Sequence, residues 1–198
     1  MVSVRKAICI AALLLLCLPL SAGRLDKAFE ALGVHDYFKA KELFEKSLKS
    51  DEMLSNYGLS LIYSRDNNPF YQLDSAFSCI ERSINAYDDV KAKDKKKIFE
   101  EQAVDKDTLY AQRQHIASLA LDAAVKEHSV AALEAVIRKY PFSVRQDEAI
   151  TRRDELAFAQ AEKQHTWSAY KTFADTYPNA PQSARARELY QKLLFEET

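Results

Sequence analysis

The chain has little glycine, little cysteine and no excess of basic charge, and each shortage narrows the choice of fold or function. Of its three glycines, only Gly33 and Gly58 lie beyond the first 23 residues, which argues against folds rich in β-turns. Cys9 and Cys17 stand in an N-terminal apolar segment, so Cys79 has no disulfide partner once that segment is removed. A formal net charge of −1 gives no indication of a nucleic-acid partner.

Motifs that carry chemistry are also missing from the sequence. It contains no His-Glu-x-x-His, Cys-x-x-Cys, Gly-x-Ser-x-Gly or glycine-rich phosphate-binding pattern. His128 and His165 occupy the same position in two copies of a repeat, so we interpret both as structural. Cys79 falls on a predicted helical core position, where a cysteine acts as a small apolar residue. We therefore expect no catalytic residue, no metal site, no cofactor and no enzymatic activity.

The N-terminus has the pattern of a secretory signal peptide over residues 1–23. Two basic residues precede an apolar run over residues 7–20, which is too short to span a bilayer comfortably, and Ser21-Ala22-Gly23 supplies small residues for cleavage near Ala22 or Gly23. Leu16 precedes Cys17 where lipidation signals require a small residue, which argues against a lipoprotein. We expect an exported protein, periplasmic or associated with the cell envelope, with no membrane span after cleavage.

A repeat with a spacing of 37 residues dominates the second half of the chain, over residues 107–198. Lys126-Glu127-His128-Ser129 recurs as Lys163-Gln164-His165-Thr166, and Tyr140-Pro141 recurs as Tyr177-Pro178. Fixed periods of 20 to 50 residues are typical of helical repeat arrays. One such hairpin cannot cover its own apolar face, so neighbouring units are expected to stack.

Each unit is predicted to be a pair of antiparallel helices. Ser129 and Thr166 precede apolar-periodic segments and are expected to be N-caps. The spacing places Tyr170 and Phe173 on the buried side of the first helix of the second unit. The second helices are expected over residues 145–163 and 181–195, with Pro181 as a first helical residue. A joining helix over residues 107–127 is predicted to start at an Asp107-Thr108 cap and to bury four apolar side chains, Leu109, Ile116, Leu119 and Val125.

Residues 24–87 contain a second repeat, because Ala40 to Leu48 recurs as Ala76 to Ile84 with the apolar positions kept. The run Asp36-Tyr37-Phe38-Lys39-Ala40, followed by Phe44, resembles the second helix of a tetratricopeptide repeat, and Gly58 stands where that repeat has its small first-helix residue. The enlarged turn after Tyr63 resembles that of Sel1-like variants. The resemblance implies an all-α fold, an α-α superhelix of antiparallel helix hairpins.

The resemblance also implies a concave face that binds a protein or peptide. Its candidate residues lie on the third predicted helix and on the enlarged loop that follows: Asn56, Tyr57, Tyr63, Phe70 and Tyr71.

The segment over residues 88–106 is rich in Lys and Asp and is predicted to form a solvated helix from Lys91 to Glu101. It either acts as a hinge or continues one superhelix; we favour the continuous form. The sequence therefore predicts a non-enzymatic scaffold of the bacterial cell envelope with a protein or peptide partner. The alternative is an adapter or N-terminal module of a larger envelope enzyme or of an outer-membrane assembly complex.

Overall fold

The computed structural model describes residues 23–196, which are all-helical and contain no strand, as the sequence predicts. The expected signal peptide, apart from Gly23, lies outside the described residues. None of the helices in the described part is long and apolar enough to cross a membrane. Ten helices follow one another between residues 23 and 196: α1 (Arg24–Gly33), α2 (Tyr37–Ser47), α3 (Glu52–Tyr63), α4 (Leu73–Asp89), α5 (Ala92–Gln102), α6 (Lys106–Glu127), α7 (Val130–Lys139), α8 (Gln146–Gln164), α9 (Trp167–Thr176) and α10 (Ser183–Glu196).

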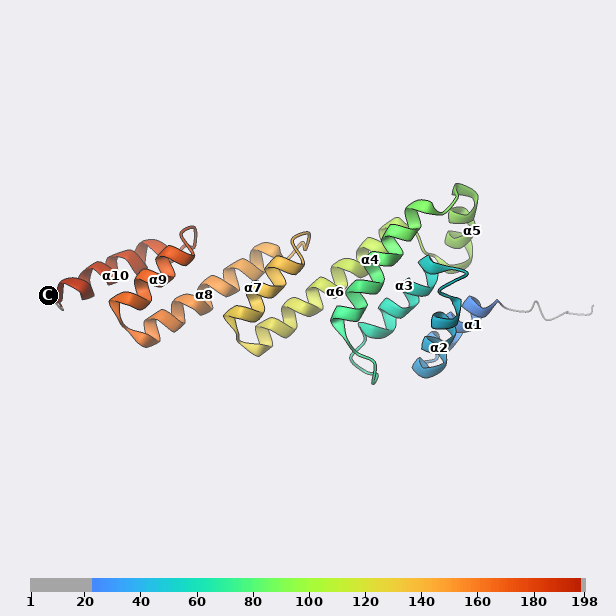
Figure 1. The fold of residues 1–198 in the computed structure, drawn as a ribbon, viewed down its shortest axis with the longest axis horizontal. Helices are drawn as coiled ribbons and strands as arrows, with labels where there is room; N and C mark the ends of the chain where they lie inside the picture. Colours follow the sequence, from blue (N-terminus) through green and yellow to red (C-terminus); the bar gives the residue numbers. More distant parts are fainter. Residues whose placement is uncertain (1–22, 197–198) are drawn as a thin grey trace, which may run out of the picture.

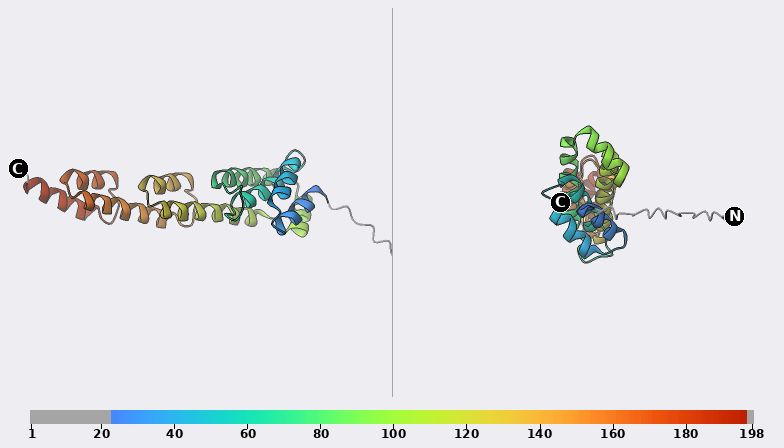
Figure 2. Two further views of the ribbon diagram at one scale, coloured as in Figure 1. Left: turned by 90° about the horizontal axis from the view of Figure 1, so that it is seen from below. Right: turned by 90° about the vertical axis from the view of Figure 1, so that its right-hand side faces the viewer.

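The molecule is elongated, with the N-terminal helices at one end and the C-terminal helix at the other (Figure 1). From α4 onward the helices other than α5 form two rows, which Figure 2 (left) shows one above the other. Helices α6, α8 and α10 form the lower row, almost end to end, and α4, α7 and α9 form the upper row. Helix α6 packs against α4 and α7, and α8 packs against α7 and α9, so these two lower helices each bridge two upper ones, while α10 packs against α9.

Helices α1 to α4 form a compact N-terminal block in which Phe44 of α2 is central. Phe44 is completely buried and packs edge-on against Phe29, with the ring centroids 4.9 Å apart. Its ring also lies directly on Gly58 of α3, because a Cβ added to Gly58 would come within 2.2 Å of the Phe44 ring. No side chain fits between the two helices at that point, so glycine is required by close approach.

Helix α6 joins the N-terminal block to the C-terminal repeats. Its Leu109 and Ile116 are fully buried, and its Gln112 donates a buried hydrogen bond of 2.9 Å to the hydroxyl of Ser64, just beyond α3. Helix α5, by contrast, has no buried residue, as expected for the charged segment. Val104, in the turn between them, is only 1% exposed, so this charged segment contributes one anchor to the core.

The predicted capping of the C-terminal hairpins is confirmed. Ser129 accepts a hydrogen bond from the Ala132 amide at 3.3 Å, and Thr166 accepts one from the Ala169 amide at 3.2 Å. The preceding histidines, His128 and His165, both end a helix in the left-handed conformation, with φ of 56° and 50°. Their equivalence supports the structural interpretation of the pair.

Other predictions about the repeats need correction. Tyr170 and Phe173 are buried as predicted, with exposures of 2% and 4%. Val125 was expected to point inward but is 37% exposed, because it lies in the last turn of α6 and lines an open cavity with Leu133 and Leu156.

Two predicted helix starts are also displaced. The cap of α6 is Asp105 rather than Asp107, since its carboxylate accepts from the Thr108 amide at 2.8 Å. Helix α10 begins at Ser183, which leaves Pro181 in the preceding turn. The Ser183 hydroxyl donates a hydrogen bond to the Tyr177 carbonyl, which holds the turn that precedes α10.

Candidate partner-binding slots

The five residues expected to line a groove do not form one continuous surface. Asn56 is 2% exposed, and its amide donates a hydrogen bond of 2.8 Å to the Glu52 carbonyl of its own helix. It therefore does not face a partner. Tyr57 is half-buried against Phe29 of α1, with ring centroids 6.4 Å apart, and burial raises the pKa of its phenol.

The remaining three residues lie at the end of α3 and on the loop after it. Tyr63 packs against both N-terminal core clusters, and burial raises the pKa of its phenol. Phe70 packs edge-on against Phe38 at 4.8 Å between ring centroids and lies under the Lys41 ammonium. Tyr71 is 40% exposed. Phe38 of α2 is 69% exposed, so Phe38, Phe70 and Tyr71 leave a small aromatic surface where α2 meets this loop, while Tyr57 and Tyr63 serve mainly as packing residues.

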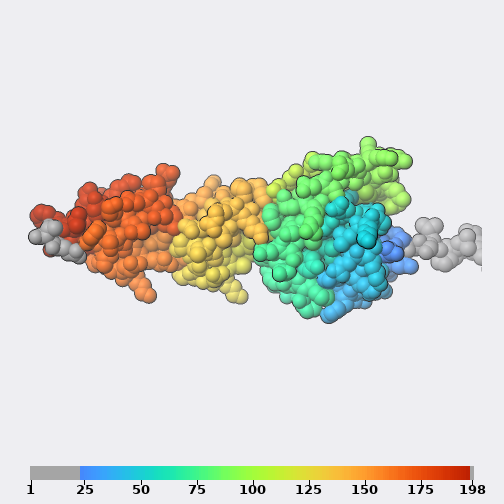
Figure 3. All heavy atoms as spheres, in the orientation of Figure 1, coloured from blue at the N-terminus to red at the C-terminus, as the bar shows by residue number. Residues whose placement is uncertain are grey.

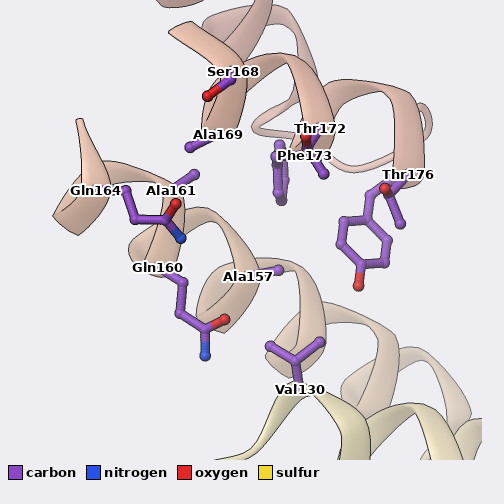
Figure 4. Close-up of a pocket in the computed structure, with 11 residues that line it drawn as sticks. Val130, Ala157, Gln160, Ala161, Gln164, Ser168, Ala169, Thr172, Phe173 and Thr176 are labelled. Carbon is purple, nitrogen blue, oxygen red and sulfur yellow. The ribbon is translucent and has the colours of Figure 1, made fainter. Parts of the chain in front are cut away.

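A different feature, two slots between the upper helices, repeats along the molecule. The first lies between α7 and α9 above α8, and we call it the α8 slot (Figure 4). It has a volume of about 290 Å³. Figure 4 shows Thr172 and Phe173 of α9 on one side and Ala157 and Ala161 of α8 on the other.

The second slot lies between α4 and α7 above α6, and we call it the α6 slot. Its volume is about 360 Å³. Nine of its lining residues correspond to lining residues of the α8 slot after a shift of 37 positions, from Ala120 and Ala157 at one end to Tyr140 and Tyr177 at the other. The slots are therefore one structural feature that occurs twice. They exist because each upper helix packs on the lower row, whereas neighbouring upper helices make few contacts with each other.

Small side chains hold both slots open. Ala120, Ala124 and Ala132 in the first unit recur as Ala157, Ala161 and Ala169 in the second, so a lower and an upper helix meet through methyl groups. Larger side chains at these positions would fill the space. This repeated alanine pattern is the sequence signal of the slots, which the large core residues of the repeat do not indicate.

The two slots differ in chemistry. The α8 slot carries uncharged polar groups, Gln160 and Gln164 from α8 with Ser168, Thr172 and Thr176 from α9. In the α6 slot, Ala123 and Ala135 replace Gln160 and Thr172, and the charged residues Glu127 and Lys139 replace Gln164 and Thr176. An ion pair between Lys139 and Asp74 joins the two walls of this slot. One slot thus offers hydrogen-bonding groups and the other offers apolar surface beside charges.

A tyrosine ends each slot and is held by defined contacts. Tyr177 donates a hydrogen bond of 2.8 Å to the carboxylate of Glu134, and the Arg153 guanidinium lies 4.5 Å from its ring centroid. Burial, together with Glu134, raises the pKa of Tyr177 to about 12. Burial likewise raises the pKa of Tyr140 to about 12, so both phenols stay neutral at physiological pH. They act as fixed walls rather than as acids or bases.

The described residues offer little basis for metal binding or for a reactive cysteine. Over residues 23–196 no group of three or more His, Cys, Asp or Glu side chains could hold a metal ion. Burial raises the pKa of the Cys79 thiol, which disfavours the reactive thiolate. No protein-family model matches the chain, and no curated protein matches it significantly.

Proposed function

We propose that the chain is a non-enzymatic scaffold of the bacterial cell envelope that binds a partner protein across its slots. The observation that carries the proposal is the pair of equivalent slots, 37 residues apart in sequence, which follow each other along one elongated body. Single surface hollows are common, whereas a hollow built twice at equivalent repeat positions indicates a repeated contact surface. The basic and apolar N-terminal pattern supports export.

We further propose that the hairpins form a tetratricopeptide-like superhelix. The close approach of Gly58 to Phe44 supports this, since the residue at the small first-helix position of the second repeat packs directly on the large second-helix residue of the first. The stacking of α2 on α3 and of α6 on both α4 and α7 supports a continuous array rather than two domains with a hinge.

Binding at two slots gives the partner both affinity and register. A segment that engages one slot is held close to the next, so the second contact forms without a further loss of translational freedom. The unlike linings then fix its direction, because an apolar group suits the α6 slot and a hydrogen-bonding group suits the α8 slot.

The experiment that tests this function fills the slots from solvent-exposed positions. Ala135 and Thr172 are equivalent exposed residues in the two slots, and each is replaced by Trp, singly and together, in the tagged full-length protein. Partner recovered from an envelope extract should fall with each single change and disappear with both.

The matched controls are Arg138→Trp and Asp175→Trp, at equivalent exposed positions of α7 and α9 outside the slots. Recovery unchanged by the double slot variant, or lost equally in the controls, would contradict the proposal.

A further inference from the structure

A third cavity lies where the end of α6 meets α7 and α8, and it differs from both slots. We call it the His128 cavity; its volume is about 300 Å³. Val125, Leu133 and Leu156 give it apolar walls, and His128, Arg152 and Glu155 supply its polar groups. Arg152 and Glu155 form an ion pair of 3.5 Å, so the rim carries no net charge from these two residues.

The next repeat shows what this space holds when it is filled. The residue 37 positions after Leu133 is Tyr170, and the residue 37 positions after His128 is His165. Tyr170 is 2% exposed, and its hydroxyl lies 3.2 Å from Nδ1 of His165. In the second unit, therefore, the chain fills the corresponding space with its own phenol.

The backbone around the two histidines is equivalent, which makes the comparison direct. Both histidines end a helix with positive φ, and each is followed by a hydroxyl N-cap, Ser129 or Thr166. Tyr170 also packs in one cluster with Leu193, the counterpart of Leu156 in the wall of the His128 cavity. The inner part of the space corresponds in the two units, at the histidine and at Leu156 and Leu193. The outer residues differ, because Val125, Arg152, Glu155 and Ala159 are replaced in the second unit by Glu162, Leu189, Lys192 and Glu196. At the inner positions, what the first unit lacks is the ring and hydroxyl of Tyr170.

Leu133 points to the same place but is too short to replace a tyrosine. It is buried, with 2% exposure, and it packs with Leu121 and Leu156. Among the described residues, no side chain takes the position beside the His128 ring that the Tyr170 hydroxyl takes beside His165. Val125, His128, Arg152, Glu155 and Ala159 are exposed, so the cavity is open to solvent.

We propose that the His128 cavity binds a tyrosine side chain presented by the partner protein. The ring lies against Leu133 and Leu156, and the hydroxyl bonds the His128 ring as Tyr170 bonds His165. The paired rim charges favour a neutral phenol over a phosphotyrosine or a carboxylate. This proposal rests on the proposed scaffold function, because the tyrosine belongs to the partner.

The test uses p-cresol, the side chain of tyrosine, so that no partner needs to be known. Binding to the full-length protein is followed by chemical-shift changes of His128, Val125 and Leu156, with toluene as the probe that lacks the hydroxyl. We expect saturable shifts with p-cresol and about fivefold weaker binding of toluene, the effect of one hydrogen bond. His128→Ala should remove that difference.

Two variants block the cavity in different ways. Leu133→Tyr fills it from inside, and Ala159→Trp covers it from an exposed position where folding is not at risk. Both should abolish p-cresol binding, whereas Leu133→Met, which keeps the side-chain volume, should retain it.

Absence of saturable shifts, equal binding of toluene, or binding that survives Ala159→Trp would overturn the tyrosine proposal. Those results would leave the scaffold proposal standing if Trp in the slots still prevents partner recovery, so the two can fail separately.

Discussion

The N-terminal block and the C-terminal repeats are built from the same element, a helical hairpin, but they bury it differently. Two large clusters hold helices α1 to α6 together, with eleven and nine buried residues, while the C-terminal clusters contain six and four. The space-filling view shows the difference as a thick N-terminal half and a slim C-terminal half (Figure 3). Helix α1 contacts α3 across the block, whereas neighbouring upper helices of the repeats stand apart. Slots therefore arise where hairpins are joined only through one row.

The largest expected effects come from removing one buried ring in each region. Phe44→Ala and Phe173→Ala should each destabilise their surroundings by about 3–5 kcal/mol through lost burial and an unfilled cavity. Hydrogen exchange should show increased exchange over all of α1 to α4 for Phe44→Ala. For Phe173→Ala it should show the increase over α9, α10 and the C-terminal part of α8, which Phe173 contacts through Phe158, because stability in a linear array is local. If increased hydrogen exchange extended equally far along the chain in both variants, the N-terminal block and the C-terminal repeats would not differ in how they are stabilised.

Next in size is a buried ion pair that only the second repeat contains. Asp154 is 3% exposed and pairs with Arg153 at 2.6 Å, while the same positions of the first unit are the buried apolar residues Ile116 and Ala117. Arg153→Ile alone leaves a buried carboxylate and should cost about 2–4 kcal/mol in chemical denaturation.

The double variant Arg153→Ile/Asp154→Ala copies the first unit and should restore most of the loss. A double variant as unstable as the single one would mean that the two units are not equivalent in packing.

A smaller effect is expected at the tightest contact of the N-terminal block. Gly58→Ala should destabilise by about 1–3 kcal/mol, because the added methyl group overlaps the Phe44 ring, which has nowhere to move. Gly33→Ala is the matched control, since a Cβ there meets no atom within 4 Å and alanine favours the helix. The midpoint temperature of thermal unfolding should therefore fall for Gly58→Ala and stay level or rise for Gly33→Ala. The same change in midpoint for both variants would contradict the close approach of Gly58 to Phe44.

The smallest effect concerns two N-caps whose pKa values move in opposite directions. Burial raises the pKa of Asp51 above its ordinary 3.8, so its contribution to stability is present below that value and is lost as pH rises. Hydrogen bonds from the Thr108 amide and hydroxyl lower the pKa of Asp105, so its contribution is present above 3.8 and is lost as pH falls.

We compare the free energy of unfolding of Asp51→Asn and of Asp105→Asn with that of the parent protein at pH values around 3.8. The difference from the parent should change with pH in opposite directions for the two variants. Changes in the same direction would show that one of the two carboxylates is in a different environment.

The sequence predicted the helices well because their signals are local. Ser129 and Thr166 precede apolar stripes, and the spacing that buried Tyr170 and Phe173 needs no knowledge of the neighbours. The errors are of a different kind. Val125 lies at the edge of an open cavity between α6, α7 and α8, whereas Asn56 is 2% exposed, so only the arrangement of helices decides their exposure. The slots depend on what is absent between α7 and α9, which a search for large apolar residues does not detect.

The central claim, that a partner lies in the two slots, is tested most directly by site-specific photo-cross-linking. A photoreactive amino acid is placed at position 135 or 172 in the slots, and at position 138 or 175 outside them, in the full-length protein. We expect the same protein to be captured from positions 135 and 172 and from neither control position. Capture of that protein from 138 and 175 but not from the slots would contradict the account.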